Sequence, residues 1–275
     1  MMRGLLFAAG LLAASIACAQ ENAVQRGRYL VYAGGCITCH TAEDDETQAL
    51  AGGRALESPF GTFFSPNITP DAETGIGSWS DEDFLSAFWE GVGPDGRYYF
   101  PAFPYTSYTG LTREDLLAIK AWLFKQEPVR RENRAHELPW YLDTRLAAAA
   151  WQLLKFDAVR FEPDPAQSPE WNRGAYLVRH LGHCGECHTP RDALGGSLVD
   201  REMAGIEKGG DYKAAPNISP HPDDGIGNWS RQELELLLEI GMLPDGDFVG
   251  GGMAAVIDDN TGQLTREHRS AIAVY

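Results

Sequence analysis

A large part of this chain's sequence occurs twice, and this repeat constrains its fold more than any other feature. Four segments from the first half of the 275 residues recur in the second half in the same order. The matching pairs are RGRYLVYAGGCITCHT (26–41) with RGAYLVRHLGHCGECHT (173–189), SPNITPDAETGIGSWS (65–80) with APNISPHPDDGIGNWS (215–230), GVGPDG (91–96) with GMLPDG (241–246), and LTREDLLAIKAW (111–122) with LTREHRSAIAVY (264–275). A long internal repeat indicates tandem copies of one structural unit. We therefore predict two domains, residues 20–126 and 171–275, joined by a linker of residues 127–170.

The first residues have the pattern of an export signal. Arg3 precedes an apolar run over residues 5–17, and Ala17-Cys18-Ala19 is a small-residue cleavage pattern. We predict a signal peptide over residues 1–19, cleavage after Ala19 and a periplasmic mature chain. Two alternatives remain: lipid attachment at Cys18, and an uncleaved amphipathic segment. No segment of the mature chain is long and apolar enough to cross a membrane.

The net charge of the chain limits the classes of molecule that it is expected to bind. The sequence has 39 acidic and 23 basic side chains, a formal net charge of −16. A strongly acidic surface argues against nucleic acid and anionic lipid as partners.

The pattern of both repeats is typical of helices joined by long loops, so we predict an all-α fold. Ser80 and Ser230 each begin a helix with an acidic residue three positions later, and Thr112 and Thr265 begin the last helix of each copy. A short helix is expected over residues 24–35, and no alternating strand pattern is present. The glycine- and proline-rich stretches 51–78 and 204–228 need a large apolar group to wrap around.

The linker is predicted to contain one helix. Its middle has apolar residues at helical spacing. These residues are Leu142, Leu146, Ala149, Ala150, Leu153 and Leu154. We expect this helix to pack its apolar side across one or both domains.

Each repeat contains a Cys-x-x-Cys-His motif, which is the attachment signature of c-type haem. The motifs are Cys36, Cys39 and His40 in the first copy and Cys184, Cys187 and His188 in the second. Two thiols three positions apart can form thioethers with two haem vinyl groups, and the histidine then lies under the iron. Zinc binding, a redox dithiol and two disulfides are alternatives, but they do not explain the long wrapping loops. We predict two covalently bound haem c groups, in two tandem class I-like cytochrome c domains.

The opposite axial ligand differs between the copies. Met253 follows His188 by a typical interval and lies among glycines, so we predict that it binds the second iron. Met242 is the rival, although core packing suits it better. The repeat places Phe103 opposite Met253, and phenylalanine cannot bind iron. The first haem therefore has an open sixth position or an unusual ligand, for which His136 is the first candidate.

The motifs together resemble the cytochrome c subunits of periplasmic, membrane-associated dehydrogenases for alcohols, sugars and aldehydes. The matching pieces are RGRYLV…CITCHT, FGTFFSPNITPDAETGIGSWSDEDF, PAFPYTSY and HCGECHTP…APNISPHPDDGIGNWS…MAAV. The resemblance implies small helical domains with His/Met iron. It also implies electron flow from a quinoprotein, flavin or molybdenum catalytic subunit to a quinone or oxidase. The chain departs from the family in having two motifs where well-known members have three, in Phe103, and in ending at Tyr275 without a membrane-binding tail.

We expect an electron-transfer protein without a reaction of its own, whose partners are a dehydrogenase donor and a quinone, cytochrome or oxidase acceptor. The alternative is a haem enzyme or small-ligand sensor that uses an open sixth position on the first haem. The sequence shows no obvious acid–base pair beside Phe103 for such an enzyme.

Overall fold

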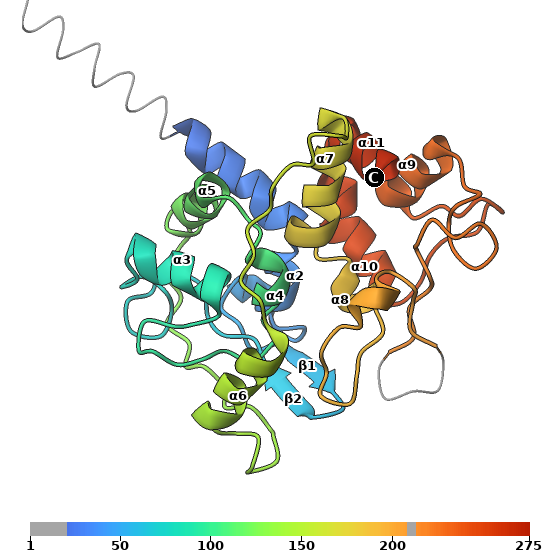
Figure 1. Ribbon diagram of the computed structural model, residues 1–275. Helices are drawn as coiled ribbons and strands as arrows, with labels where there is room; N and C mark the ends of the chain where they lie inside the picture. The colour runs from blue at the N-terminus through green and yellow to red at the C-terminus, as the bar shows by residue number, and fades with distance from the viewer. Residues whose placement is uncertain (1–20, 208–212) are drawn as a thin grey trace, which may run out of the picture.

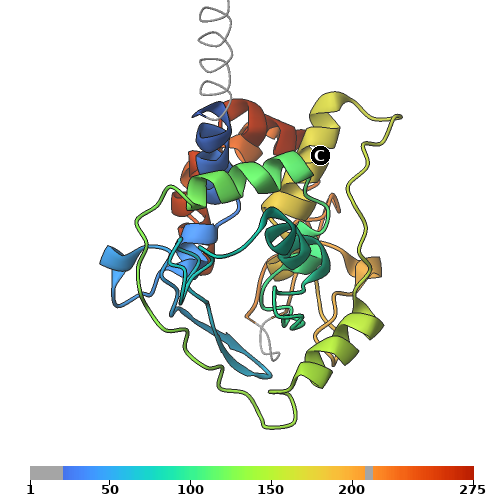
Figure 2. The same ribbon diagram turned by 90° about the vertical axis from the view of Figure 1, so that its left-hand side faces the viewer.

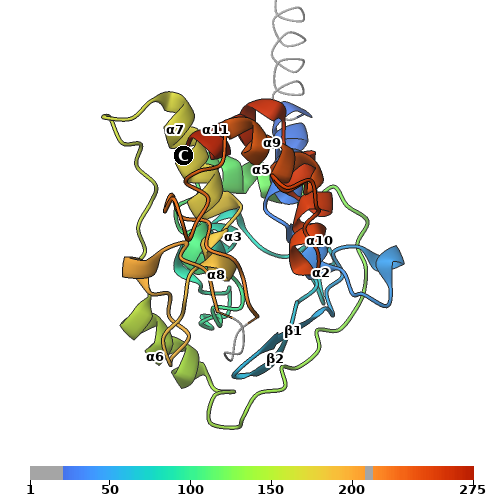
Figure 3. The same cartoon turned by 90° about the vertical axis from the view of Figure 1, so that its right-hand side faces the viewer.

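The computed structural model describes residues 21–207 and 213–275, so the predicted signal peptide lies outside the described residues. The fold is mostly helical. Residues 21–33 are helical, and the other elements follow in chain order. They are α2 (Cys36–His40), η1 (Glu46–Gln48), β1 (Ala55–Ser58), β2 (Gly61–Phe64), α3 (Asp81–Glu90), α4 (Tyr105–Tyr108), α5 (Arg113–Leu123), α6 (Arg145–Lys155), α7 (Pro169–Tyr176), the π-helical turn η2 (Leu177–Leu181), α8 (Gly185–His188), η3 (Val199–Arg201), α9 (Arg231–Ile240), α10 (Gly252–Asp259), η4 (Thr261–Gln263) and α11 (Arg266–Val274). The helix of residues 21–33 lies with α5, α7 and α11 at one end of the molecule, and α6 and the two strands lie at the other (Figure 1, Figure 2, Figure 3).

The predicted helix starts are confirmed. Ser80 and Ser230 both form complete capping boxes, in which the serine hydroxyl accepts from the backbone N–H three residues later and that residue's carboxylate accepts from the serine N–H. Thr112 and Thr265 cap α5 and α11 in the simpler way, with a hydroxyl that accepts a backbone N–H. These local signals recur in both halves because the same sequence recurs.

The expectation of no strands is wrong in one place. β1 and β2 form an antiparallel hairpin in the loop that follows the first motif, with Ala55 opposite Phe64. Its outer edge pairs with the linker, because Thr62 and Glu137 exchange both backbone hydrogen bonds, at 3.1 and 2.8 Å. Each strand has only 4 residues, which is too short for an alternating pattern to stand out, and the pairing with Glu137 spans more than 70 residues of sequence.

The two halves of the chain share one buried apolar cluster. Leu30 and Phe84 from the first half are within it, as are Leu177 and Leu264 from the second. Full burial of such side chains contributes roughly 1.5–3 kcal/mol each. The halves are therefore packed together, and the division into tandem domains 20–126 and 171–275 stays a prediction.

Each half also binds the last helix of the other half through a tyrosine. The Tyr176 hydroxyl donates to Asp115 Oδ2 at 2.7 Å, and the Tyr29 hydroxyl lies 2.5 Å from His268 Nδ1. Each hydroxyl further accepts the backbone N–H of the capping threonine, at 3.2 Å. Tyr29 and Tyr176 occupy the same place in the two repeats, so the two contacts are equivalent except that His268 stands where the first half has Asp115.

The linker helix α6 is present as predicted, but its orientation is the reverse of the expectation. Leu146, Leu153 and Leu154 are exposed, whereas Ala148 and Gln152 are buried. The rest of the linker runs along the outside of the molecule between α5 and α7 (Figure 2). Helical periodicity identifies an apolar face without telling which side of the helix the protein covers.

Candidate haem-attachment sites

The two Cys-x-x-Cys-His motifs form short helical turns. Cys36 and His40 bound α2, and Cys184 immediately precedes α8, which ends at His188. Residues three apart lie on the same face of a helix, so each turn presents both thiols together. The four motif cysteines are unpaired, so the part of the chain that the structure describes contains no disulfide within or between the motifs.

Both motif histidines are held by a backbone carbonyl from a distant loop. His40 Nδ1 lies 2.8 Å from the carbonyl oxygen of Pro66, and His188 Nδ1 lies 2.8 Å from that of Pro216. A carbonyl can only accept, so each Nδ1 carries the proton and donates it. Within the described residues, neither imidazole makes a hydrogen bond through Nε2. A histidine that binds a metal through Nε2 has the same arrangement, with the proton on Nδ1 and Nε2 free.

The loop after each motif has the same backbone conformation in both halves. The N–H groups of Gly52 and Gly205 donate to the carbonyls of His40 and His188, at 2.7 and 2.8 Å. Leu50 and Met203 occupy equivalent positions and both have positive φ, 66° and 61°. The backbone N–H of each donates to the threonine hydroxyl that follows its motif. Non-glycine residues rarely adopt this conformation, and such strain concentrates at functional sites.

Burial keeps the motif side chains neutral. It raises the pKa of Cys36 to about 12 and that of Cys184 to about 11, and it lowers the pKa of His40 and His188. A redox-active dithiol needs a thiolate with a lowered pKa, so these thiols do not resemble one. Neutral imidazoles are the form that binds metal.

The motif of each half contacts a short helix of the other half, which follows Phe103 in the first half and contains Met253 in the second. Thr106 and Ser107 of α4 both donate to Glu186 Oε1 at 2.9 Å, and Thr38 donates to Asp259 of α10 at 2.8 Å. The views in Figures 1 and 3 place α10 alongside α2. Burial is the main cause of the raised pKa of Cys39, which Arg54 opposes and Cys187 of the other motif reinforces.

Comparison with known proteins identifies the family to which the chain belongs. A protein of Cereibacter sphaeroides described as a dihaem c-type cytochrome is 41% identical over 253 residues, covering 91% of this chain and 83% of the relative. The cytochrome subunit of a fructose dehydrogenase from Gluconobacter japonicus is 37% identical over 261 residues, 94% of this chain and 53% of the relative. The cytochrome c subunit of an alcohol dehydrogenase (quinone) from Gluconobacter oxydans is 36% identical over 284 residues, 98% of this chain and 58% of the relative. No protein-family model matches.

The chain belongs to this family of c-type cytochromes. It spans little more than half the length of the two dehydrogenase subunits. The residues of the cytochrome fit haem: two unpaired, neutral thiols and one imidazole with a free Nε2 lie together in each half. A bound haem supplies a one-electron iron couple, and the chain's residues orient and insulate it. In the described residues, no helix combines the length and apolar character needed to cross a bilayer.

Phe103 of the cytochrome packs among aromatic rings. Its ring centroid lies 5.2 Å from that of Phe88, 5.7 Å from that of Tyr108 and 5.8 Å from that of Tyr99. Met253 is in the first turn of α10 and is partly buried, and Met242 follows the end of α9. The assignment of Met253 as an iron ligand stays a prediction.

His136 makes a hydrogen bond that suits an iron ligand poorly. Its Nδ1 accepts the backbone N–H of Phe64 at 3.1 Å, and its ring lies against Phe63 and Phe100. An Nδ1 that accepts leaves the proton of the neutral ring on Nε2, the opposite of the arrangement in His40 and His188. Sequence reasoning named His136 and missed Pro66 and Pro216, although both prolines stand within the repeated Pro-Asn-Ile segments.

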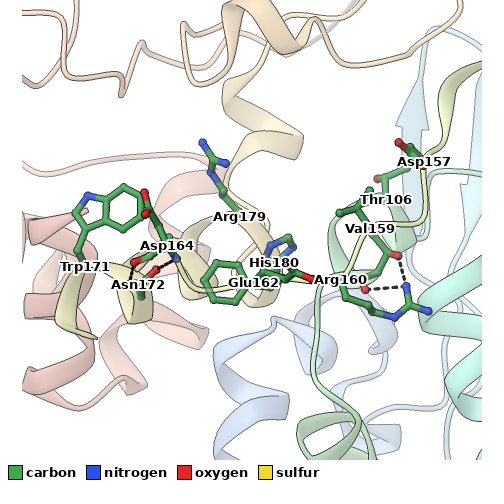
Figure 4. A pocket seen from close by; sticks show the side chains of 13 residues that line it. Thr106, Asp157, Val159, Arg160, Glu162, Asp164, Trp171, Asn172, Arg179 and His180 are labelled. Atoms are coloured by element: carbon green, nitrogen blue, oxygen red, sulfur yellow. Dashed lines mark hydrogen bonds between the residues drawn. The ribbon is translucent and has the colours of Figure 1, made fainter. Parts of the chain in front are cut away.

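A separate cavity of about 520 Å³ lies between linker residues 157–164 and α7 (Figure 4). Arg160 donates to both oxygens of Thr109 on one side, and Asn172 bonds Asp164 on the other. None of the motif cysteines or histidines lines this cavity. It is therefore distinct from the candidate haem sites.

Proposed function

We propose that the cytochrome is a dihaem electron-transfer protein that carries electrons from a dehydrogenase catalytic subunit to a quinone, cytochrome or oxidase acceptor. One haem is attached through Cys36 and Cys39 with His40 on the iron, and the other through Cys184 and Cys187 with His188 and Met253. The mature chain is exported after removal of residues 1–19, and residues 20–126 and 171–275 each hold one haem.

The observation that carries this proposal is the duplicated histidine–proline hydrogen bond. It orients a free Nε2 beside two unpaired thiols in each half, which is what covalent haem attachment requires. The names of the relatives support the donor, because several are cytochrome subunits of dehydrogenases. Those relatives are named as cytochrome subunits, and on this ground we assign the chain no reaction of its own.

The test is reduction by a dehydrogenase. Purified cytochrome is added to an extract of the cells that make it, and oxygen is removed. A primary alcohol, an aldehyde or an aldose is then supplied, and the absorbance of the haems is followed. We expect substrate-dependent reduction with at least one class. A protein that holds haem and stays oxidised with every class would contradict the proposed donor.

One observation favours a second candidate, a small-ligand site on the first haem. Phe103 and the rings around it offer aromatic packing where the second half offers a thioether. The hydrogen bond from Phe64 to His136 Nδ1 makes that histidine a poor substitute ligand. An open iron would bind carbon monoxide or a peroxide.

A further inference from the structure

The outward side of α6 carries an apolar surface. Leu146, Leu153 and Leu154 expose 81%, 87% and 68% of their area, and the preceding Trp140 and Tyr141 expose 85% and 59%. We call these five side chains the α6 face. Large apolar side chains gathered on a surface mark an interaction site more often than scattered ones do.

The orientation of α6 is fixed by its inner side. Gln152 donates to the carbonyls of Glu90 and Gly91, both at 3.1 Å, and Trp151 Nε1 donates to the carbonyl of Leu194 at 2.8 Å. The helix also ends in an ion pair between Lys155 and Asp192. These contacts reach both halves of the chain, so the leucines point outward because polar groups hold the other side of the helix against the protein.

The α6 face lies directly behind segments that follow both candidate haem sites. Tyr105, two residues after Phe103, has its ring centroid 6.5 Å from that of Trp151 and 4.9 Å from that of Phe156. Leu194, which Trp151 contacts, lies in the loop after the second motif. A helix is roughly 10 Å thick, so a protein bound to the α6 face would lie about one helix diameter from these segments.

The charge of the residues around α6 indicates which kind of molecule binds to the α6 face. Residues 138–159 contain two acidic and two basic residues, a net charge of zero in a chain whose total is −16. A second copy would carry the same total charge of −16, and this overall repulsion disfavours pairing of two chains. A helix that lies in a membrane surface typically has a cationic polar face turned to the headgroups, whereas the polar side of α6 is turned into the protein. Tryptophan and tyrosine with few charges are typical of protein–protein interfaces.

We propose that the α6 face is the docking surface for the catalytic subunit of a dehydrogenase. This inference rests on the proposed function above and adds the place where the donor binds. The apolar side chains supply the affinity, and the inner contacts of α6 place the donor beside both haem-binding halves.

The test uses purified, haem-loaded cytochrome with an affinity tag as the bait. It is incubated with extract of the cells that naturally make it, captured and washed, and then given a primary alcohol, an aldehyde or an aldose. The readout is the rate at which the substrate reduces the captured haems. For the double variant Leu153→Glu, Leu154→Glu we expect a loss of about tenfold or more. Val199→Glu is the matched control, because Val199 is 82% exposed and lies off the α6 face.

The possible outcomes distinguish failure of the proposed docking surface from failure of the proposed function. Equal rates in wild type and the double variant, with equal haem content and equal reduction by ascorbate, would overturn the docking surface alone. No reduction by wild type with any substrate class would remove the proposed donor as well. Self-association of wild type that Leu153→Glu abolishes, measured by sedimentation, would assign the face to a second copy instead. Flotation of wild type alone with phosphatidylcholine–phosphatidylglycerol vesicles would assign it to lipid.

Discussion

The Nδ1 atom of His188 lies 2.8 Å from the carbonyl oxygen of Pro216, 28 residues away in the chain. His40 and Pro66 repeat this relationship at the same distance. Donation from Nδ1 fixes the ring and makes Nε2 a better electron donor to a metal. Because this hydrogen bond is the same in both candidate sites, it does not itself distinguish the two haems, whereas Phe103 and Met253, at the predicted opposite positions, differ.

The first prediction concerns haem count. Exported mature protein should carry two haems per chain that survive acid–acetone extraction, because each half presents a pair of unpaired thiols. Cys36→Ala together with Cys39→Ala should leave one, measured by the pyridine haemochrome spectrum against protein concentration. The first half should also unfold more easily, since loss of a large buried group removes folding free energy.

The matched control for that count is Cys184→Ala with Cys187→Ala, which should leave the other haem. One haem in the unmodified protein, or two in either double variant, would contradict the assignment of one haem to each motif.

The second prediction concerns Met253. Met253→Ala should abolish the weak far-red charge-transfer band of methionine-bound ferric haem and lower the potential of the second haem, because a thioether favours the ferrous state. Absorption spectra and potentiometry measure both. Met242→Ala is the control and should change neither. If the band instead disappears with Met242→Ala, the repeat has been aligned wrongly around the second site.

Sequence reasoning predicted the elements whose signals are local. The capping residues Ser80 and Ser230 and the helix α6 could be found because their patterns lie within a dozen residues. The two 4-residue strands of the hairpin are too short to show an alternating pattern, and the outward orientation of Leu153 depends on contacts of α6 with distant segments. The motif cysteines and histidines can be recognised in the sequence because their function depends on their side chains. Pro66 and Pro216 act through a backbone carbonyl, which has no side-chain signature.

The third prediction uses the pair formed by Tyr29 and His268. Arg173 Nε donates to His268 Nε2 at 3.1 Å, so the ring binds there as a neutral acceptor. Burial, and then the charge of Arg173, lower the pKa of His268 below its ordinary value of 6.5, while Glu267 and Asp115 oppose the shift. A lowered pKa means that the unfolded chain takes up the proton first. Stability from this group is therefore present above pH 6.5 and is lost as pH falls through the folded pKa.

His268→Asp should reduce this acid sensitivity, because it recreates the arginine–aspartate contact that Arg26 and Asp115 make at 2.6 Å in the first half. The free energy of unfolding in urea is compared at about pH 5.5 and pH 7.5. Tyr29→Phe should lower it by about 1 kcal/mol in wild type, the usual contribution of one hydrogen bond. An unchanged pH dependence in His268→Asp would show that other groups account for it, such as His136, His180 and His183, whose pKa values burial also lowers.

The last prediction concerns Phe103 and the direction of electron flow. Without a thioether, the first haem should have a lower potential than the second, and about 59 mV is a tenfold ratio for one electron. A gap of about 100 mV would then favour an electron on the second haem by roughly fifty to one, which gives the order donor, first haem, second haem, acceptor. Phe103→Met should raise the lower potential toward the higher one, and potentiometry with spectra should resolve both waves. Equal potentials in the native protein would remove the directional role of Phe103.

Carbon monoxide tests the same site independently of potential. The rings around Phe103 supply no nitrogen or sulfur ligand, and His136 Nδ1 is occupied by the Phe64 N–H. Ferrous protein should therefore bind one carbon monoxide per chain rapidly, and Phe103→Met should slow this binding because a thioether then competes for the iron. Slow binding in the native protein would mean that a protein ligand occupies the iron. His136→Ala would then separate this histidine from the tyrosines, because only loss of the true ligand restores rapid binding.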